Sequence, residues 1–363
     1  MLSKRIWIYV AIMLLTAGTA AALTPQEQLG KNLFFDTNLS EPAGQTCASC
    51  HDPNTAFAEP DKNLPVSEGV IPGRFGTRNS PSAAYAVFNG QFTLKSGIMG
   101  GQFWDGRAAN LTEQAKGPFV NPVEMNNPNR SSVIGKINNS AYAALFEQIC
   151  GPNAFDSANT NRSYDCMAGA IAAFEGTSEL NKFTSKFDAY LSGTYTLTPD
   201  EDRGRRLFGG SGKCTHCHPD NGNPVVFSDF KFHNIGIPKN SEFPFPANPA
   251  NFPADPGLGG FLNDPRQNGQ FKTPHLRNIN VTGPYMHNGV LKNLKQVVHF
   301  YNTRDVLGVC SNSTDPGFGI TCWPAPETMT NLDSSFMGNL GLTDTEENAI
   351  VAFMQTFTDG FTP

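Results

Sequence analysis

The feature that most restricts how this chain can fold is a motif, Cys-x-x-Cys-His, that occurs twice and ends at His51 and at His218. The motif cysteines are Cys47, Cys50, Cys214 and Cys217. Two thiols one helical turn apart, with an adjacent imidazole, can bind both vinyl groups of a porphyrin and ligate its iron. For a single copy, a thioredoxin-like dithiol or half of a zinc site is the alternative. Because two copies occur in one chain, we predict two covalently bound haem c groups, with His51 and His218 as proximal ligands.

The first 22 residues resemble a cleavable export signal. Lys4 and Arg5 precede an apolar run that begins at Ile6, and a stretch of small residues ends at Ala22. An uncleaved membrane anchor is the alternative, but an apolar run of about a dozen residues is short for a bilayer span of roughly 20. We predict a periplasmic protein that begins near Leu23 and has no membrane span after the signal is removed.

Composition and charge restrict the kinds of fold and the classes of partner that are possible. Only 16% of residues are charged, while 35 Gly, 27 Pro and 28 Phe indicate short elements, long ordered loops and a large apolar cofactor. Loss of the two basic residues of the signal changes the formal charge from −6 to −8. A net negative charge argues against nucleic acid as a partner and is compatible with a basic redox protein.

The four remaining cysteines are expected to form disulfides, because the chain is predicted to be exported. They are Cys150, Cys166, Cys310 and Cys322, and they allow three pairings. Short loops close most readily, so proximity favours Cys150 with Cys166 and Cys310 with Cys322. We expect these bridges to be structural.

The two halves of the chain repeat a pattern of helices. An N-cap Thr followed by Glu three residues later opens a helix at Thr24–Glu27, Thr198–Glu201 and Thr343–Glu346, and the first two helices also carry Pro at the first position. Gly30 and Gly204 occupy matching places before each haem motif. The sequence Ala-Ile-Ala-Ala-Phe at residues 170–174 recurs as Ala-Ile-Val-Ala-Phe at residues 349–353. Each half is therefore expected to begin and end with a helix.

This duplication predicts the domain organisation. Gly, Ser and Thr interrupt the helical pattern at residues 190–198. We therefore predict a mainly α chain with two c-type cytochrome domains, residues 23–190 and 191–363. Between the terminal helices of each domain, long loops wrap the haem and β structure is scarce.

Several further motifs occur in order along the chain. They are residues 102–108, 113–118, 121–125, 273–278 and 282–289. Together with both haem motifs, they resemble the bacterial di-haem cytochrome c peroxidase and MauG family over essentially the whole mature chain. The resemblance implies an oxidoreductase that uses hydrogen peroxide, with a peroxide-reacting haem in the N-terminal domain and an electron-transfer haem in the C-terminal domain.

The resemblance also implies roles for individual residues. Gln114 and Glu124 match the family's distal pair above the first haem, where a carboxylate can move a proton between the two peroxide oxygens. Without the resemblance, a Glu in a loop rich in Pro and Asn is usually a solvated or capping residue. Trp104 matches the tryptophan between the two haems, which relays electrons. The positions that match the family's interface calcium site are Asn79, Thr282 and Pro284.

The first departure from the family pattern concerns the first haem. Many members place a His over this haem in the resting state, but no His occurs between His51 and His216. We therefore predict an open or water-bound site that reacts when both irons are ferric. Met99 is the alternative cap. His216, inside the second motif, is expected to be an ordinary exposed side chain.

The second departure concerns the second haem. The ordinary peroxidases use a Met at the position 14 residues after His287, where this chain has Tyr301. In the helix predicted from Leu291 to Tyr301, the apolar residues and Tyr301 share one face, and His299 points elsewhere. Tyr301 is thus the predicted axial ligand, as in MauG. A core Tyr301, with the iron bound by a methionine, is the alternative; the candidate methionines are Met329 and Met337.

Three functions remain open at this point. The first is reduction of peroxide with electrons from a small cytochrome or copper protein. The second is MauG-like oxidation of Trp or Tyr side chains on a partner protein. The third, of another class, is a di-haem electron-transfer or redox-sensing cytochrome. Glu124 and Gln114 argue against the third, because a carrier needs no distal acid-base pair, while Tyr301 favours the second.

Overall fold

The computed structural model describes residues 22–95, 97–243 and 253–362 of the chain. Over these ranges the chain is mainly helical, and its four strands are two or three residues long. The predicted mainly α fold with little β structure is therefore confirmed. The predicted export signal lies outside the described residues, apart from its last position. Within the described ranges no helix is both long enough and apolar enough to cross a bilayer.

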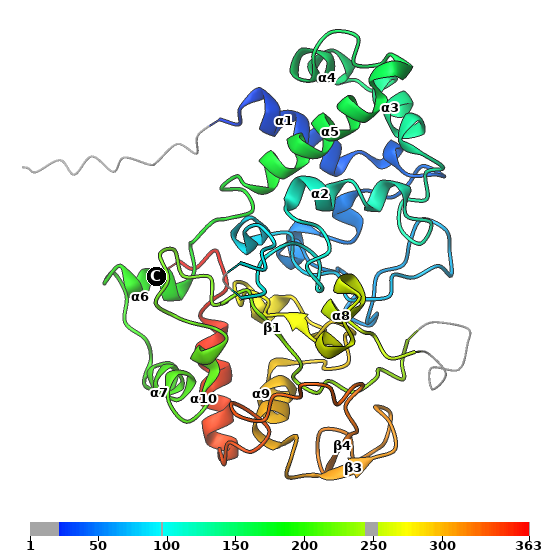
Figure 1. The fold of residues 1–363 in the computed structure, drawn as a ribbon. Coiled ribbons are helices and arrows are strands. Elements are labelled where there is room, and N and C mark those ends of the chain that lie inside the picture. The colour runs from blue at the N-terminus through cyan, green and yellow to red at the C-terminus, as the bar shows by residue number, and fades with distance from the viewer. Residues whose placement is uncertain (1–21, 96, 244–252, 363) are drawn as a thin grey trace, which may run out of the picture.

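The helices form two groups that follow the two halves of the chain (Figure 1). The upper group consists of α1 (Pro25–Phe35), α2 (Leu111–Ala115), α3 (Arg130–Asn138), α4 (Ala143–Cys150) and α5 (Thr160–Glu175). The second group consists of α6 (Lys186–Leu191), α7 (Pro199–Gly209), α8 (Leu258–Leu262), α9 (Leu294–Thr303) and α10 (Asp344–Gln355).

The strands all belong to the second half of the chain. They are β1 (Phe232–His233), β2 (Phe271–Lys272), β3 (Gly308–Cys310) and β4 (Cys322–Pro324). β1 and β2 pair antiparallel, with Phe232 opposite Lys272. β3 and β4 pair parallel, with Cys310 opposite Pro324. Most of the chain between the helices is thus loop.

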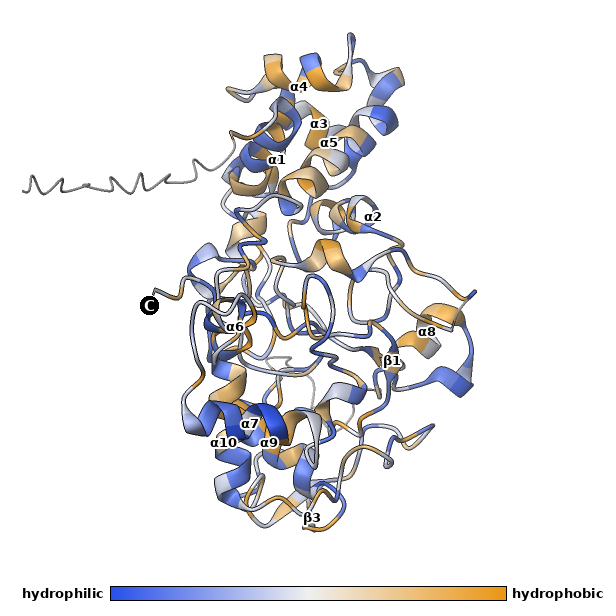
Figure 2. Ribbon diagram, turned by 90° about the vertical axis from the view of Figure 1, so that its left-hand side faces the viewer, coloured by the Kyte–Doolittle hydropathy of each residue, from blue (hydrophilic) through white to orange (hydrophobic). Residues whose placement is uncertain are grey.

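Buried apolar side chains form one cluster in each group. The first includes residues from Leu29 to Leu180 together with Val226, and the second runs from Phe187 to Phe357. Figure 2 shows hydrophilic and hydrophobic residues mixed along the helices of both groups, as expected for helices that bury one face. The chain passes from one cluster to the other between Leu180 and Phe187.

A glycine fixes the same helix crossing in both groups. α1 packs against α5, and α7 packs against α10. A Cβ on Gly30 would lie 1.9 Å from the carbonyl oxygen of Ala170, and a Cβ on Gly204 would lie 1.9 Å from that of Ala349. Because only glycine lacks this atom, only glycine allows such close approach of two helix backbones. The duplication seen in the sequence is therefore also a duplication of packing.

The three predicted capping boxes are formed. In each, the Thr hydroxyl accepts a hydrogen bond from the Glu main-chain N–H at 3.3–3.4 Å, and the Glu carboxylate accepts one from the Thr N–H. The pairs are Thr24–Glu27, Thr198–Glu201 and Thr343–Glu346. These caps account for the starts of α1, α7 and α10.

The predicted start of α9 at Leu291 is wrong. The helix begins at Leu294, because the side chain of Asn293 accepts the main-chain N–H of Gln296 at 2.9 Å and acts as the N-cap. Leu291 precedes the helix and instead forms a β-bridge with Tyr285.

A buried ion pair joins α6 to the rest of the second group. Arg277 is fully buried and donates to the two carboxylate oxygens of Asp188 at 2.6 and 2.9 Å. Burial works against ionisation of Asp188, but these hydrogen bonds hold the pKa of its carboxyl below the usual value. The helix α6, which directly follows the passage between the two groups, is therefore held by an ion pair as well as by apolar packing.

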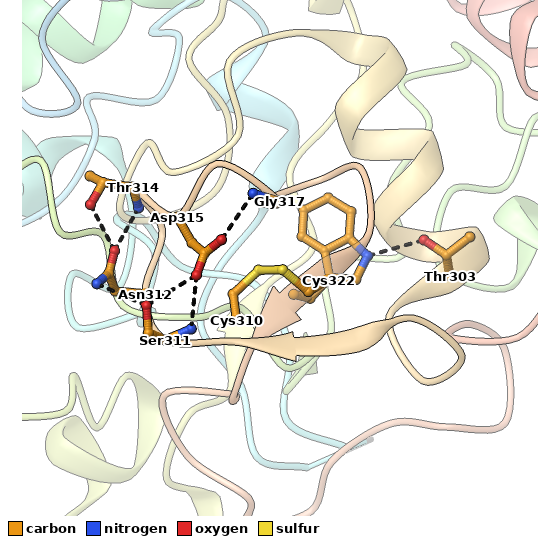
Figure 3. The surroundings of a disulfide bond; sticks show 9 residues. Thr303, Cys310, Ser311, Asn312, Thr314, Asp315, Gly317 and Cys322 are labelled. Atoms are coloured by element: carbon orange, nitrogen blue, oxygen red, sulfur yellow. Dashed lines mark hydrogen bonds between the residues drawn. A yellow bond between two sulfur atoms is a disulfide. The ribbon is translucent and has the colours of Figure 1, made fainter.

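Both favoured disulfides are present. Cys150–Cys166 joins α4 to α5, and Cys310–Cys322 joins β3 to β4 (Figure 3). Trp323 follows the second bridge and donates its indole N–H to the hydroxyl of Thr303 on α9 at 3.0 Å. The second bridge thus holds its loop against the helix that carries Tyr301.

Candidate functional site

One cavity lies between the two helix groups, and both Cys-x-x-Cys-His motifs line it. We call it the central cavity. It is also lined by the residues that match the family's distal pair, its tryptophan relay and its calcium site, and by the predicted axial ligand of the second haem. These are Asn79, Trp104, Gln114, Glu124, Thr282, Pro284 and Tyr301. Residues from distant parts of the sequence therefore meet around a single space.

The first motif presents two thiols and one imidazole to the cavity. A short 3-10 turn at Cys47–Ser49 carries the first cysteine, and Thr46 caps it. Cys47 and Cys50 form no disulfide, and burial raises the pKa of both thiols. His51 Nδ1 lies 3.2 Å from the carbonyl oxygen of Phe57, and burial lowers the pKa of its imidazole.

The second motif has the same geometry. A 3-10 turn at Cys214–His216 carries it, and both of its thiols are free. His218 Nδ1 lies 2.8 Å from the carbonyl oxygen of Phe227. His216 is exposed, as predicted, and stacks on Phe336 at a ring distance of 4.1 Å.

The chemistry of both motifs fits haem c. Since a carbonyl only accepts, each His donates its Nδ1–H to the main chain, and its other nitrogen is left free for a metal. Buried imidazoles that stay neutral are the form in which histidine binds iron. Cysteines that line the cavity and are not paired in a disulfide suit attachment of the porphyrin vinyl groups. The bound haem would be held at Cys47, Cys50 and His51 in one half, and at Cys214, Cys217 and His218 in the other.

Gln114 and Glu124 come from two neighbouring segments of the first half. Gln114 lies on α2, and Glu124 lies in the loop that follows it. Glu124 Oε1 accepts a hydrogen bond from the Asn121 side chain at 2.9 Å. Burial nevertheless raises the pKa of the Glu124 carboxyl, against the opposing effect of Arg107. A carboxyl in this state can exchange a proton closer to neutral pH than an ordinary Glu can.

Three carboxyls with raised pKa values surround the first motif. Besides Glu124 they are Glu59 and Glu175, and burial raises the pKa of Glu175 to about 8. Glu124 and Glu175 lie close enough to raise the pKa of the Cys47 thiol, as Glu59 and Glu124 do for Cys50. Sequence reasoning missed Glu59 and Glu175, because nothing in their local sequence reveals burial.

Asp229, the acid beside the second motif, has a lowered pKa instead of a raised one. Burial opposes ionisation of Asp229, but His233, whose Nε2 lies 3.6 Å from the carboxylate, and a hydrogen bond from the main-chain N–H of Lys231 hold the pKa of this carboxyl below the usual value. Contacts with Asp229 and with the Cys217 sulfur raise the pKa of His233 to about 10. This pair carries fixed opposite charges, whereas the carboxyls of the first motif can take up and release protons.

Trp104 and the three predicted calcium ligands all line the central cavity, and Trp104 contacts one of those ligands, Asn79. The indole N–H of Trp104 donates to the main-chain carbonyl of Asn79 at 2.8 Å. Asn79 also donates its side-chain N–H to Pro65 at 3.0 Å, which leaves its side-chain oxygen free. Oxygens of this kind, with the main-chain carbonyls of Thr282 and Pro284, are suitable ligands for Ca²⁺.

Tyr301 lies on the cavity face of α9. Burial raises the pKa of its phenol, and the nearby thiols of Cys217 and Cys214 raise it further, so the hydroxyl lies close to the second motif. His299 points to Glu347 instead, with Nδ1 2.9 Å from the carboxylate.

The alternative ligands occupy different environments. Met337 is 4% exposed and lines the central cavity, whereas Met329 is 66% exposed and lies outside it. Met99, the alternative cap of the first haem, also lies outside the cavity and pairs with Thr93 in a β-bridge. Among the methionines named from the sequence, Met337 alone competes with Tyr301 for this space.

The cavity also contains charged residues that the sequence did not reveal. Arg78 donates to Asp105 at 2.6 Å and to Asp255 at 2.7 Å, which links the two halves of the chain. Lys272 is buried near Asp105 of this network, and the partly buried His275 lies near Lys272. An isolated basic residue in a loop-rich sequence carries no signal of such burial.

Comparisons with known proteins identify the family of this chain. A family model described as di-haem cytochrome c peroxidase matches residues 24–196. The methylamine utilization protein MauG of Paracoccus denitrificans is 37% identical over 96% of this chain and 94% of its own length. The cytochrome c551 peroxidase of Pseudomonas aeruginosa is 36% identical over 75% of this chain and 70% of its own length.

A solved structure gives the same assignment. The diheme peroxidase BthA from Burkholderia thailandensis superposes with a TM-score of 0.79 at 32% identity, over 95% of this chain and 88% of that chain. Sequence relatives and structural neighbours therefore agree along nearly the full length. The chain belongs to the di-haem cytochrome c peroxidase and MauG family of oxidoreductases, whose members carry two haem c groups.

Proposed function

We propose that this chain is a periplasmic di-haem peroxidase with two haem-wrapping cytochrome domains, residues 23–190 and 191–363. In this proposal the N-terminal haem reacts with hydrogen peroxide and the C-terminal haem exchanges electrons with it through Trp104. The main support is the contrast between the two motifs, because among the residues that the structure describes only those around the first motif include carboxyls with raised pKa values.

The contrast matters because peroxide reduction consumes protons. One H₂O₂, two electrons and two protons give two waters, so the reacting site must deliver protons as well as electrons. The haem, when bound, supplies the iron that takes part in electron transfer. Glu124, held by Asn121, would take a proton from one peroxide oxygen and return it to the other. Gln114 would orient the peroxide by hydrogen bonding.

A second candidate function is oxidation of side chains on a partner protein, as the name of the MauG relative suggests. Tyr301 is the observation in its favour. A phenolate ligand stabilises higher oxidation states of iron, whereas a Met thioether raises the reduction potential. Such a haem is a poor acceptor from a high-potential cytochrome and a better store for oxidising equivalents. A di-haem carrier or sensor without turnover would leave Glu124 and Gln114 without a role.

Calcium at the junction is part of the same proposal. Asn79 belongs to the first half of the chain, while Thr282 and Pro284 belong to the second. A cation bound by all three would hold the halves in the relative position that electron transfer requires. The small redox donor, or the oxidisable partner protein, is proposed to interact with the C-terminal domain.

The test is optical and magnetic spectroscopy of the purified ferric holoprotein before and after one equivalent of peroxide. We expect an immediate change at the first haem without prior reduction, because no histidine is available to block it. A site that reacts only after half-reduction would contradict the open first site. Adding reduced cytochrome c then separates the two candidates: rapid reversal indicates peroxide reduction, and persistence indicates oxidation of a partner protein.

A further inference from the structure

Lys272 places an ammonium group in the central cavity. It is the second residue of β2, and its main-chain N–H donates to the carbonyl of Trp104 at 2.8 Å. The residue is 7% exposed and belongs to the lining of the cavity. Its backbone is thus fixed beside the proposed electron relay, while its side chain remains inside.

The ammonium has no acceptor among the described residues. No hydrogen bond or ion pair joins its Nζ to any of them, in contrast to the other two cations buried to this degree. Arg277 pairs with Asp188 at 2.6 Å, and Arg304 pairs with Asp305 at 2.6 Å. A buried ammonium without a counter-charge is strongly unfavourable. Lys272 is therefore the exception that requires an explanation.

The nearest groups do not supply the missing charge. Asp105 is the carboxylate that acts on Lys272, but it already accepts hydrogen bonds from Arg78 at 2.6 Å and from Arg107 at 3.0 Å. The partly buried His275 lies nearby, and its Nδ1 is without a partner. Burial lowers the pKa of Lys272 to about 7, because the charge of Asp105 offsets only part of the cost of burying the ammonium. The site thus lacks one anion.

We propose that the ammonium of Lys272 forms an ion pair with a haem propionate inside the central cavity. Haem carries two carboxylates on the side of the ring opposite the vinyl groups, so a porphyrin attached at either motif directs them away from that motif. Two haems therefore bring buried anions into a cavity that holds an unpaired buried cation. The inference rests on the family's haem and not on the reaction proposed above.

The test compares Lys272→Met with Lys272→Arg in the holoprotein, without peroxide. The midpoint potential of each haem is measured by spectroelectrochemistry, and the propionate bending bands by resonance Raman. In K272M we expect one haem to shift to lower potential, since an uncompensated carboxylate favours ferric iron, with a shifted propionate band on the same haem. K272R should retain both parent values.

The matched control is Lys231→Met, which removes an exposed lysine next to β1. It changes the net charge by the same amount, and we expect both potentials to stay at the parent values. Parent potentials and Raman bands in K272M would overturn the proposal, as would an equal shift in K231M. If K272M does not accumulate with two haems per chain, Lys272→Gln replaces it, and parent values there would also overturn the proposal.

Discussion

Glu124 combines burial with a side-chain hydrogen bond that fixes its orientation. Asn121 donates to one carboxylate oxygen, which leaves the other free toward the cavity. Burial raises the pKa of Glu124, so its carboxyl takes up a proton at a higher pH than an ordinary Glu, whose pKa is about 4.3. If Glu124 is the base, the reaction slows as the pH falls through this raised value.

We predict that Glu124→Gln slows the reaction with peroxide by about 10²–10⁴-fold, the usual contribution of a positioned acid-base group. The acidic limb of the pH profile should disappear with it. Stopped-flow absorption across the pH range measures both effects. Haem content should stay at two per chain, because Glu124 holds neither porphyrin. A parent rate and an unchanged acidic limb would remove Glu124 from the mechanism.

Local sequence accounts for some site residues and not for others. The two Cys-x-x-Cys-His motifs could be recognised from sequence because their thiols and imidazole lie within five consecutive positions, and their predicted role is haem attachment. Gln114, Glu124 and Tyr301 needed the family resemblance, and their roles stay predictions. Lys272 was not predictable, because its isolation arises where segments far apart in the sequence meet.

At the scale of elements, helix starts were also predictable where their determinants are local in sequence. The capping boxes at Thr24, Thr198 and Thr343 predicted α1, α7 and α10, because both partners of each box lie within one turn. α9 starts three residues later than its apolar pattern suggested, since the cap at Asn293 determines where the helix begins. The sequence showed that Gly30 and Gly204 occupy matching positions, but it did not show why. The reason is the contact of Gly30 with α5, which joins residues far apart in the chain.

We predict that Gly30→Ala and Gly204→Ala each destabilise the protein by about 1–3 kcal/mol or more, because a Cβ would overlap a carbonyl of the facing helix. Gly135→Ala is the matched control on α3, where a Cβ meets nothing within 4 Å. It should stabilise by about 0.5–1 kcal/mol. Urea unfolding of the holoproteins measures all three. Equal effects at the three positions would refute the packing explanation.

At the scale of the molecule, several contacts join the two halves. Asp359, near the C-terminus, accepts hydrogen bonds from Tyr85 of the first half at 2.8 Å and from Asn278 of the second at 2.9 Å. Arg78 bridges Asp105 and Asp255 in the same way. The sequence predicted two similar halves, but it did not reveal these contacts, because each depends on residues far apart along the chain.

We predict one Ca²⁺ per chain at this junction, bound by Asn79, Thr282 and Pro284. Removing it with a chelator should slow electron exchange between the haems, since the cation would fix the two halves relative to each other. Metal analysis and flash-reduction kinetics test this, with calcium add-back as the control. Asn79→Ala should reproduce the chelated state. A preparation with two haems and no calcium would contradict the assignment.

The eight cysteines of the described structure fall into two chemical classes. Four are closed as bridges between neighbouring segments, and four remain thiols at the motifs. An oxidant able to close Cys310–Cys322 can also act on Cys47 and Cys50, which are only three positions apart. Maturation of this chain must therefore present Cys47 and Cys50 as reduced thiols at the moment of porphyrin attachment, while Cys310 and Cys322 are oxidised. The export compartment of such a chain therefore has to supply reducing as well as oxidising equivalents.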